Sequence, residues 1–121
     1  MKKGKDGFLP VIRLLMMPLP GVSEGTCYGT PAFYVSKKLL ARIKEDGETL
    51  VVYTPDRDEW TNQDNVTFFI TDHYKNRPYI LVDLGKVDRG ELSALLAEAW
   101  RSRAGKKLIS SLSFRNSRYP E

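Results

Sequence analysis

The side chains that could do chemistry are few in this chain. Cys27 is the only cysteine and His73 is the only histidine. A thiol and an imidazole can act as nucleophile and base when the fold brings them together, even from distant sequence positions. We favour structural roles, with Cys27 as a small packing residue and His73 as a hydrogen-bonding loop residue. The sequence therefore predicts no catalytic residue, and we expect a protein that is not an enzyme.

Metal and cofactor motifs are also missing from the sequence. A zinc site needs about four Cys, His or carboxylate ligands at suitable spacing, and no such cluster is present. The glycines at 21, 25 and 29 lack the preceding strand and the Lys-Ser/Thr ending of a phosphate-binding loop. Acidic groups at 45–48 and 56–59 could bind a hard cation, but they flank a predicted turn and open a predicted helix. We expect no metal and no cofactor.

The basic residues are more suggestive. No acidic residue interrupts the series of cations that starts at Arg101, and two more cations follow Tyr74 in the loop 72–78. Cations beside aromatic rings suit a phosphate backbone with stacked bases, whereas a solvated helix end with a loose tail is the structural alternative. The predicted nucleic-acid-binding residues are Lys75, Arg77, Arg101, Arg103, Lys106, Lys107, Arg115 and Arg118.

The composition is that of an ordinary water-soluble domain. The chain has 121 residues, 41% of them hydrophobic and 28% charged, with a formal charge of +4. This mild excess permits anionic partners without requiring them. One cysteine rules out an internal disulfide and favours a reducing compartment. Pro10, Arg13 and Pro18 interrupt the apolar N-terminal stretch, so we expect no membrane span and a cytoplasmic location.

An antiparallel sheet must position these residues. Asp46-Gly47 predicts a two-residue hairpin turn, because both residues tolerate positive φ. This turn places Ile43 opposite Leu50, Ala41 opposite Val52 and Leu39 opposite Thr54 on one apolar face. Further strands are predicted at 32–36, 66–71 and 79–84, and the glycine- and proline-rich segment 19–31 is predicted to be a shaped connection. The fold class is therefore α+β, with a sheet of about five strands and flanking helices.

Three helices are expected around this sheet. The first is short, lies between Pro10 and Pro18, and packs through Val11, Leu14 and Leu15. The second spans 56–63. The third begins at the cap Asp88, ends near Gly105, and has an apolar stripe made of Leu92, Leu95, Leu96, Ala99 and Trp100. We expect a single domain over 1–107 and an extended or partly disordered tail over 108–121.

Several segments together resemble the MmcQ/YjbR family of small α+β proteins. They are 19–33, the hairpin 38–48, 68–74 followed by Pro78, 79–84 and 91–100, in this order. The resemblance implies an antiparallel sheet flanked by helices, and it implies DNA binding, the activity with which the family is usually labelled. It also implies a pocket made of residue types that family members tend to share, namely Glu24, Thr26, Tyr28, Thr30, His73 and Tyr74.

Three functions follow from these observations. The first is a non-enzymatic protein that binds DNA without sequence specificity, because no recognition helix is evident. The second is a protein-interaction module, in which the mixed face of the sheet or the alternating residues 108–114 add a strand to a partner or to a second copy. The third is a small-molecule site centred on Tyr28, His73 and Tyr74, which requires a concave pocket lined by these side chains.

Overall fold

A single six-stranded sheet organises the fold, with the strand order β1-β2-β3-β4-β6-β5. All neighbouring strands are antiparallel. The computed structural model describes residues 7–117, and the side chains of 7–111. The strands are β1 (Val22–Cys27), β2 (Thr30–Val35), β3 (Lys38–Ile43), β4 (Thr49–Tyr53), β5 (Phe68–Phe69) and β6 (Tyr79–Asp83). The predicted α+β fold class is confirmed, with one strand more than expected.

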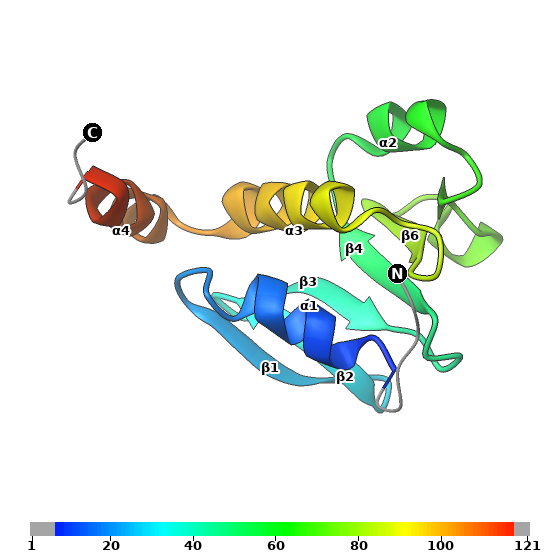
Figure 1. Ribbon diagram of the computed structural model, residues 1–121, viewed down its shortest axis with the longest axis horizontal. Helices are drawn as coiled ribbons and strands as arrows, with labels where there is room; N and C mark the ends of the chain where they lie inside the picture. The colour runs from blue at the N-terminus through cyan, green and yellow to red at the C-terminus, as the bar shows by residue number, and fades with distance from the viewer. Residues whose placement is uncertain (1–6, 118–121) are drawn as a thin grey trace.

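Helices cover one face of this sheet. α1 (Leu9–Met16) and α3 (Arg89–Arg103) pack over it, as Figure 1 shows, and α2 (Arg57–Gln63) follows β4. Their apolar side chains and those of the strands form one buried core, in which Trp100, Phe33 and Phe68 are the largest members. On the opposite face, Tyr74 of the short 3₁₀ helix η1 (Asp72–Tyr74) covers Val51 and Leu81. We refer to this second face as the open face.

The β3–β4 hairpin confirms the predicted register but not the predicted turn. Ile43 pairs with Leu50 and Ala41 with Val52. The connection is four residues long, 45–48, because Lys44 N donates to the Thr49 carbonyl at 2.8 Å. The Asp46 carboxylate orders this loop by accepting from Glu48 N at 2.8 Å and from the Thr49 backbone and hydroxyl at 2.9 and 2.8 Å. The loop stays centred on Asp46-Gly47, so the strand register is unchanged.

A bulge displaces the start of β3. The register with β2 shifts between Phe33 and Tyr34, so Leu39 pairs with Tyr34 and Leu40 becomes the extra residue. Leu40 is fully buried in the core, whereas Leu39 is only half-buried. The prediction that Leu39 shares the apolar face opposite Thr54 is therefore wrong, because a bulge interrupts the simple alternation of side chains.

The segment predicted to be a shaped connection is a second hairpin. β1 and β2 pair from Val22–Val35 to Cys27–Thr30, and the turn is Tyr28-Gly29, with φ of 53° and 78°. Gly25 lies inside β1, where a Cβ would come within 3.5 Å of the Tyr34 ring. The Tyr34 hydroxyl reaches the Thr26 carbonyl at 2.6 Å. The Tyr34 side chain thus lies across β1, and a regular strand pair replaces the predicted irregular connection, which is wrong.

The helices agree with the sequence in part. In α3, the Asp88 carboxylate accepts from Gly90 N at 2.9 Å and Glu91 N at 3.2 Å, and all five stripe residues are buried. In α1, Ile12 and Met16 are the buried residues. Of the predicted stripe, Leu15 packs against the core, whereas Leu14 is 60% exposed and was wrongly included. A strand was expected at 66–71, and the structure has a strand only at Phe68–Phe69 within this range.

The predicted tail is largely helical. α4 (Lys106–Ser117) begins just after Gly105 and projects away from the body of the protein (Figure 1). Its first turn rests on the core through Leu108, which packs against Gly21. A helix thus takes the place of the expected extended or partly disordered segment up to residue 117, while a contact of this tail with a partner or a second copy stays a prediction. Residues 118–121 lie outside the described residues.

Candidate functional site

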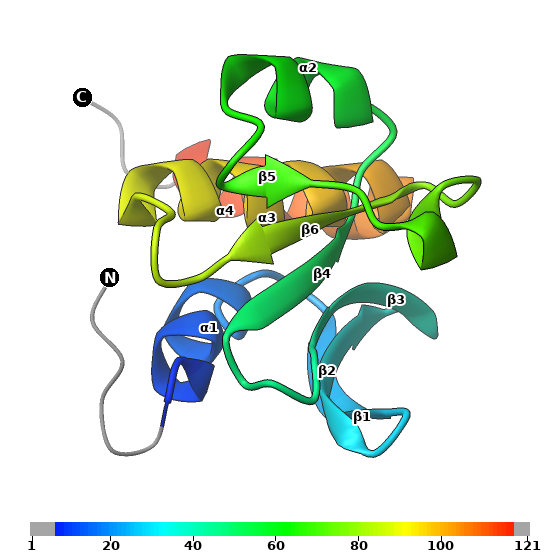
Figure 2. The ribbon, with the colours of Figure 1, turned by 90° about the vertical axis from the view of Figure 1, so that its right-hand side faces the viewer.

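Cations gather at one end of the strands. Because neighbouring strands are antiparallel, β4 ends where β6 begins, and β2 ends where β3 begins. α3 ends on the same side, where the Arg103 guanidinium carbon lies 3.7 Å from the centroid of the Tyr53 ring. In Figure 2 the loop from η1 into β6 lies at the right, as does the end of α3. We define the basic end as Lys37, Lys38, Arg57, Lys75, Arg77, Arg101, Arg103, Lys106 and Lys107.

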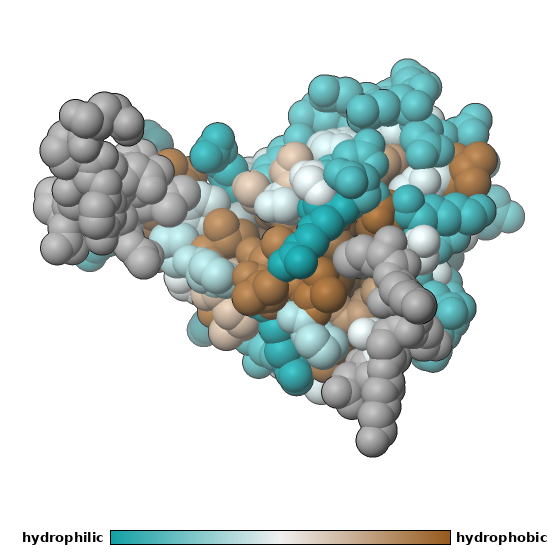
Figure 3. Space-filling view, viewed as in Figure 1, coloured by the Kyte–Doolittle hydropathy of each residue, from teal (hydrophilic) through white to brown (hydrophobic). Residues whose placement is uncertain are grey.

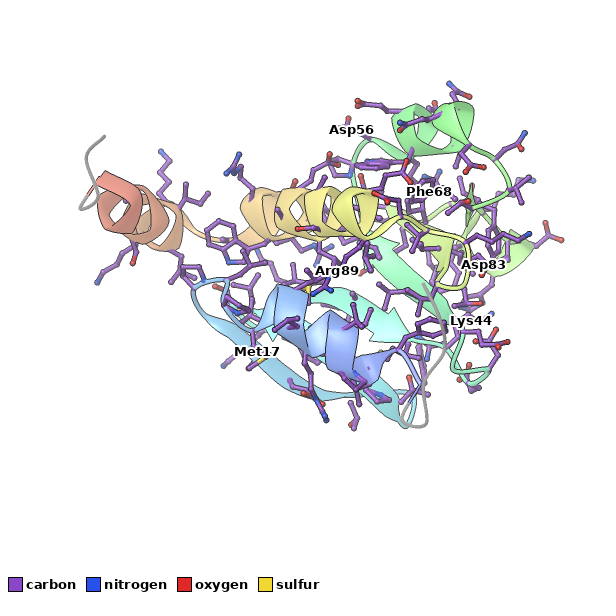
Figure 4. All side chains as sticks on the ribbon, in the orientation of Figure 1. Met17, Lys44, Asp56, Phe68, Asp83 and Arg89 are labelled. Atoms are coloured by element: carbon purple, nitrogen blue, oxygen red, sulfur yellow. The ribbon has the colours of Figure 1, made fainter. Side chains whose placement is uncertain are left out.

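The other end of the strands is mostly acidic. It holds the β3–β4 turn, low in the middle of Figure 2, and the loop from β6 into α3, at the left. Lys44 and Asp83 both lie there, far from α4 in Figure 4. We define the acidic end as Glu45, Asp46, Glu48, Asp83, Asp88 and Glu91; Lys44, Lys86 and Arg89 are interspersed. The strands thus run between two ends of opposite charge.

A surface depression of about 390 Å³ opens in the basic end. Its lining residues are Thr54, Pro55, Arg57, Lys75, Asn76, Arg77 and Pro78, which include three cations and no carboxylate. Arg57 fixes the wall, because its guanidinium donates to the Tyr74 carbonyl at 2.9 Å and to the Lys75 carbonyl at 3.1 Å. The side chains of Lys75 and Arg77 stay exposed. A fixed loop with free cations suits an anionic group such as phosphate.

Arg103 is held beside this depression by aromatic rings. Its guanidinium covers Tyr53 and lies 5.9 Å from the centroid of Tyr79. Tyr79 makes edge contacts with Tyr53 at 5.9 Å and with Tyr74 at 6.0 Å. The Nε of Arg103 is buried and has no hydrogen-bond partner in the described part of the chain. The stack fixes the plane of the guanidinium, so the group is oriented before any ligand arrives.

Carboxylates border the basic end. Glu98 of α3 accepts from the Thr54 hydroxyl at 2.9 Å and from Trp60 Nε1 at 3.4 Å, so it is occupied by internal contacts. Asp56, Asp58 and Glu59 at the start of α2 line a separate depression. Arg57 thus stands between a depression lined by three carboxylates and one that is lined by Lys75 and Arg77 without a carboxylate.

The structure brings most of the predicted nucleic-acid-binding residues to one end. Lys75 and Arg77 line the depression, while Arg101, Arg103, Lys106 and Lys107 surround the junction of α3 and α4. The side chain of Arg115 and the whole of Arg118 lie outside the described part. Sequence reasoning missed Lys37, Lys38 and Arg57, which reach this end only through the strand pairing and the position of α2.

The six residues of the predicted pocket do not line one cavity in the described structure. Glu24 forms a two-bond ion pair with Arg13 of α1, at 2.8 and 2.9 Å, and hydrogen bonding to Arg13 lowers the pKa of Glu24. Thr30 lines a cavity of about 300 Å³ near the β3–β4 turn. Tyr28 is 72% exposed, and His73 is exposed with its ring edge-on to Tyr74. Thr26 is also exposed on β1.

Some of these residues instead surround Arg42, which sequence reasoning missed. The Arg42 side chain is only 6% exposed, and its Nη1 donates to the Thr30 hydroxyl at 3.0 Å and to the Cys27 carbonyl at 3.4 Å. Its guanidinium lies 5.0 Å from the centroid of the Tyr28 ring. Burial lowers the pKa of Arg42, but the Tyr74 hydroxyl and the Glu45 carboxylate outweigh burial and raise it. Arg42 thus joins the β1–β2 turn to the open face.

The helix-covered face has a different character. Leu14 and Met17 are exposed there, and Figure 3 shows an apolar patch at its centre.

Among residues 7–117 no group of three or more His, Cys, Asp or Glu side chains could hold a metal ion. Within the same residues, no helix combines the length and the hydropathy needed to cross a bilayer. The basic end is therefore the strongest candidate for an interaction with an anionic partner.

Comparisons with known proteins agree with the fold. The crystal structure of Deinococcus radiodurans protein DR2400, with the domain DUF419, has a TM-score of 0.64 and 20% identity, and the match covers 84% of this chain and 85% of that chain. At this identity the likeness shows a shared fold alone. No curated protein matches this chain. The YjbR family model matches residues 17–102, from the end of α1 to the last turn of α3. The chain belongs to the YjbR family.

Proposed function

We propose that this protein binds nucleic acid through the basic end and catalyses no reaction of its own. The observation that carries the proposal is the gathering of exposed cations from three separate chain segments at one end of the strands. We further propose that it acts in the cytoplasm, where a lone free cysteine such as Cys27 stays reduced.

The chemistry of the basic end favours phosphates over bases. Lysine and arginine side chains displace the counterions of a nucleic acid, and this release drives binding that is independent of sequence. Arg103 and Arg57 add planar guanidinium groups, which suit phosphate oxygens. The depression lined by Lys75 and Arg77 supplies a concave place for one such contact. The proposed complex therefore reads charge and shape rather than base sequence.

The dependence of affinity on salt tests this proposal. Fluorescence anisotropy with a labelled DNA duplex at several salt concentrations should show affinity falling steeply as salt rises. The logarithmic slope gives the number of phosphates contacted. Absence of binding at low salt would contradict the proposal. An affinity that does not change with salt concentration would show that phosphate contacts do not drive binding.

Two variants with equal charge loss locate the surface. The triple variant Lys75→Ala, Arg77→Ala, Lys106→Ala changes the basic end. The triple variant Lys44→Ala, Lys86→Ala, Arg89→Ala changes the acidic end and is the control, because it alters net charge by the same amount. The first should reduce the salt slope by about one for each lost phosphate contact, and the control should leave it near the wild-type value. Equal losses in both variants would indicate a general charge effect and a different surface.

A further inference from the structure

Aromatic rings at the basic end are covered, and this limits the nucleic acid that it can hold. Single strands are bound largely by bases that stack on free aromatic faces, together with cations along the backbone. At the basic end, Arg103 occupies the face of Tyr53, and Tyr79 is engaged by Tyr53 and Tyr74. Tyr74 itself is only 6% exposed. Arg103 thus covers one face of Tyr53, the Tyr79 ring is held between two other rings, and Tyr74 is buried.

Among the side chains that the structure describes, the exposed aromatic rings are Tyr28 and His73. Tyr28 is at the β1–β2 turn, at the end of β2 opposite the one where the basic residues Lys37 and Lys38 follow. His73 is exposed on η1, but its ring packs edge-on against Tyr74 at 4.7 Å. A base stacked on Tyr28 would lie at the end of β2 opposite Lys37 and Lys38. Among its described side chains, the basic end thus combines many cations with no exposed Phe, Tyr or Trp ring.

We infer that the preferred partner of the basic end is double-stranded rather than single-stranded nucleic acid. This inference rests on the proposed function. A duplex keeps its bases stacked internally and presents phosphates at high density, which is what exposed cations without stacking faces can use. Arg103 has two effects: it contributes a phosphate contact, and it covers the Tyr53 ring so that a base cannot stack on that face.

The test compares a duplex with a single strand of equal length by fluorescence anisotropy at one low salt concentration. The wild-type protein should bind the duplex about tenfold more tightly, because the single strand lacks its stacking contribution. Equal or tighter binding of the single strand would overturn the inference while leaving the proposed function in place. Failure to bind either form would overturn both.

Arg103→Ala and Arg101→Ala form a matched pair for the same measurement. Both remove one cation from the last turn of α3, but only the first uncovers the Tyr53 ring. Arg103→Ala should weaken duplex binding and strengthen single-strand binding. The ratio of duplex affinity to single-strand affinity should therefore fall several-fold. Arg101→Ala should weaken both forms alike and keep the wild-type ratio. Equal ratios in the two variants would contradict the inference.

A double variant keeps the result interpretable if Arg103→Ala perturbs the end of α3. In Arg103→Ala, Tyr53→Leu there is no uncovered ring at position 53, so the ratio should return to the value of Arg101→Ala. A ratio that stays narrow in the double variant would show that ring exposure is not the cause, and would overturn the assignment of Arg103.

Discussion

Arg42 shows how a single residue ties this fold together. The sequence assigns it to the mixed face of a hairpin, where a charged side chain is unremarkable. In the structure the β1–β2 turn folds over it, so that Thr30, Cys27 and Tyr28 surround the guanidinium, while Glu45 approaches its Nη2 at 3.5 Å. Its burial depends on a turn and on η1, which are remote in sequence, and local alternation of side chains contains no signal for that.

Removal of the Arg42 guanidinium should destabilise the protein. Arg42→Leu keeps an apolar stem but removes the donor of the Thr30 hydroxyl and one of the two donors of the Cys27 carbonyl, which still accepts from the Thr30 hydroxyl at 3.0 Å. Unsatisfied buried groups cost about 1–3 kcal/mol, and urea denaturation should show a loss of this size. Thr30→Val removes one acceptor of Arg42 and one donor to the Cys27 carbonyl, but Arg42 and this carbonyl remain in contact, so it should cost less, about 1 kcal/mol. A loss in Arg42→Leu no larger than in Thr30→Val would mean that the guanidinium has no structural role.

Asp46 makes the stability of the β3–β4 turn dependent on pH. Burial raises the pKa of Asp46, but hydrogen bonds from Glu48 and Thr49 outweigh burial and lower it. A carboxylate with a lowered pKa in the folded state stabilises the protein above its unfolded pKa, near 4, and this stabilisation is lost as pH falls through the folded value. Asp46→Asn should therefore lose stability at pH 7 and be less sensitive to acid.

Denaturant unfolding of both proteins at pH 7 and pH 3 measures this difference. The gap between wild type and Asp46→Asn should be larger at pH 7 than at pH 3. A gap that is the same at both pH values would show that ionised Asp46 does not support the turn.

At the scale of elements, the sequence predicts best where local chemistry and packing agree. Asp46-Gly47 centres the β3–β4 hairpin, and Asp88 with five apolar residues defines α3. It fails for β1, because an exposed edge strand that contains Gly25 shows no alternation of buried and exposed residues and has only two branched residues, Val22 and Thr26. It fails for α4 because this helix is short of strong helix formers, and its contact with Gly21 joins residues far apart in sequence.

Gly21 should control the docking of α4. Its φ is +76°, and a Cβ at this position would lie 2.7 Å from a methyl carbon of Leu108. Gly21→Ala therefore strains the backbone, at a cost of about 1 kcal/mol, and displaces the first turn of α4. Hydrogen exchange should show reduced protection in α4 with little change in α3.

Gly29→Ala is the matched control, because Gly29 also has positive φ but no neighbour near its missing Cβ. It should lower overall stability without a selective effect on α4. Equal exchange in α4 for both variants would show that the Gly21–Leu108 contact does not hold the helix.

At the scale of the whole molecule, the strand topology places acidic and basic side chains at opposite ends of the sheet. The formal charge of +4 says little by itself. Antiparallel pairing sends the turns with Glu45, Asp46 and Glu48 to one end and the β2–β3 turn and the loop before β6 to the other. The sequence predicts most of the cations of the basic end, but only the fold shows that they meet at one end of the strands.

Residue-resolved NMR titration with a short DNA duplex tests the central claim most directly. Amide signals of Lys37, Lys75, Arg77, Arg103 and Lys106 should shift progressively and should return toward their free positions when salt is added. Signals of the acidic end, around Asp46 and Asp88, should stay in place. Shifts centred on the acidic end or on the α1 face, or no shifts at low salt, would contradict the account.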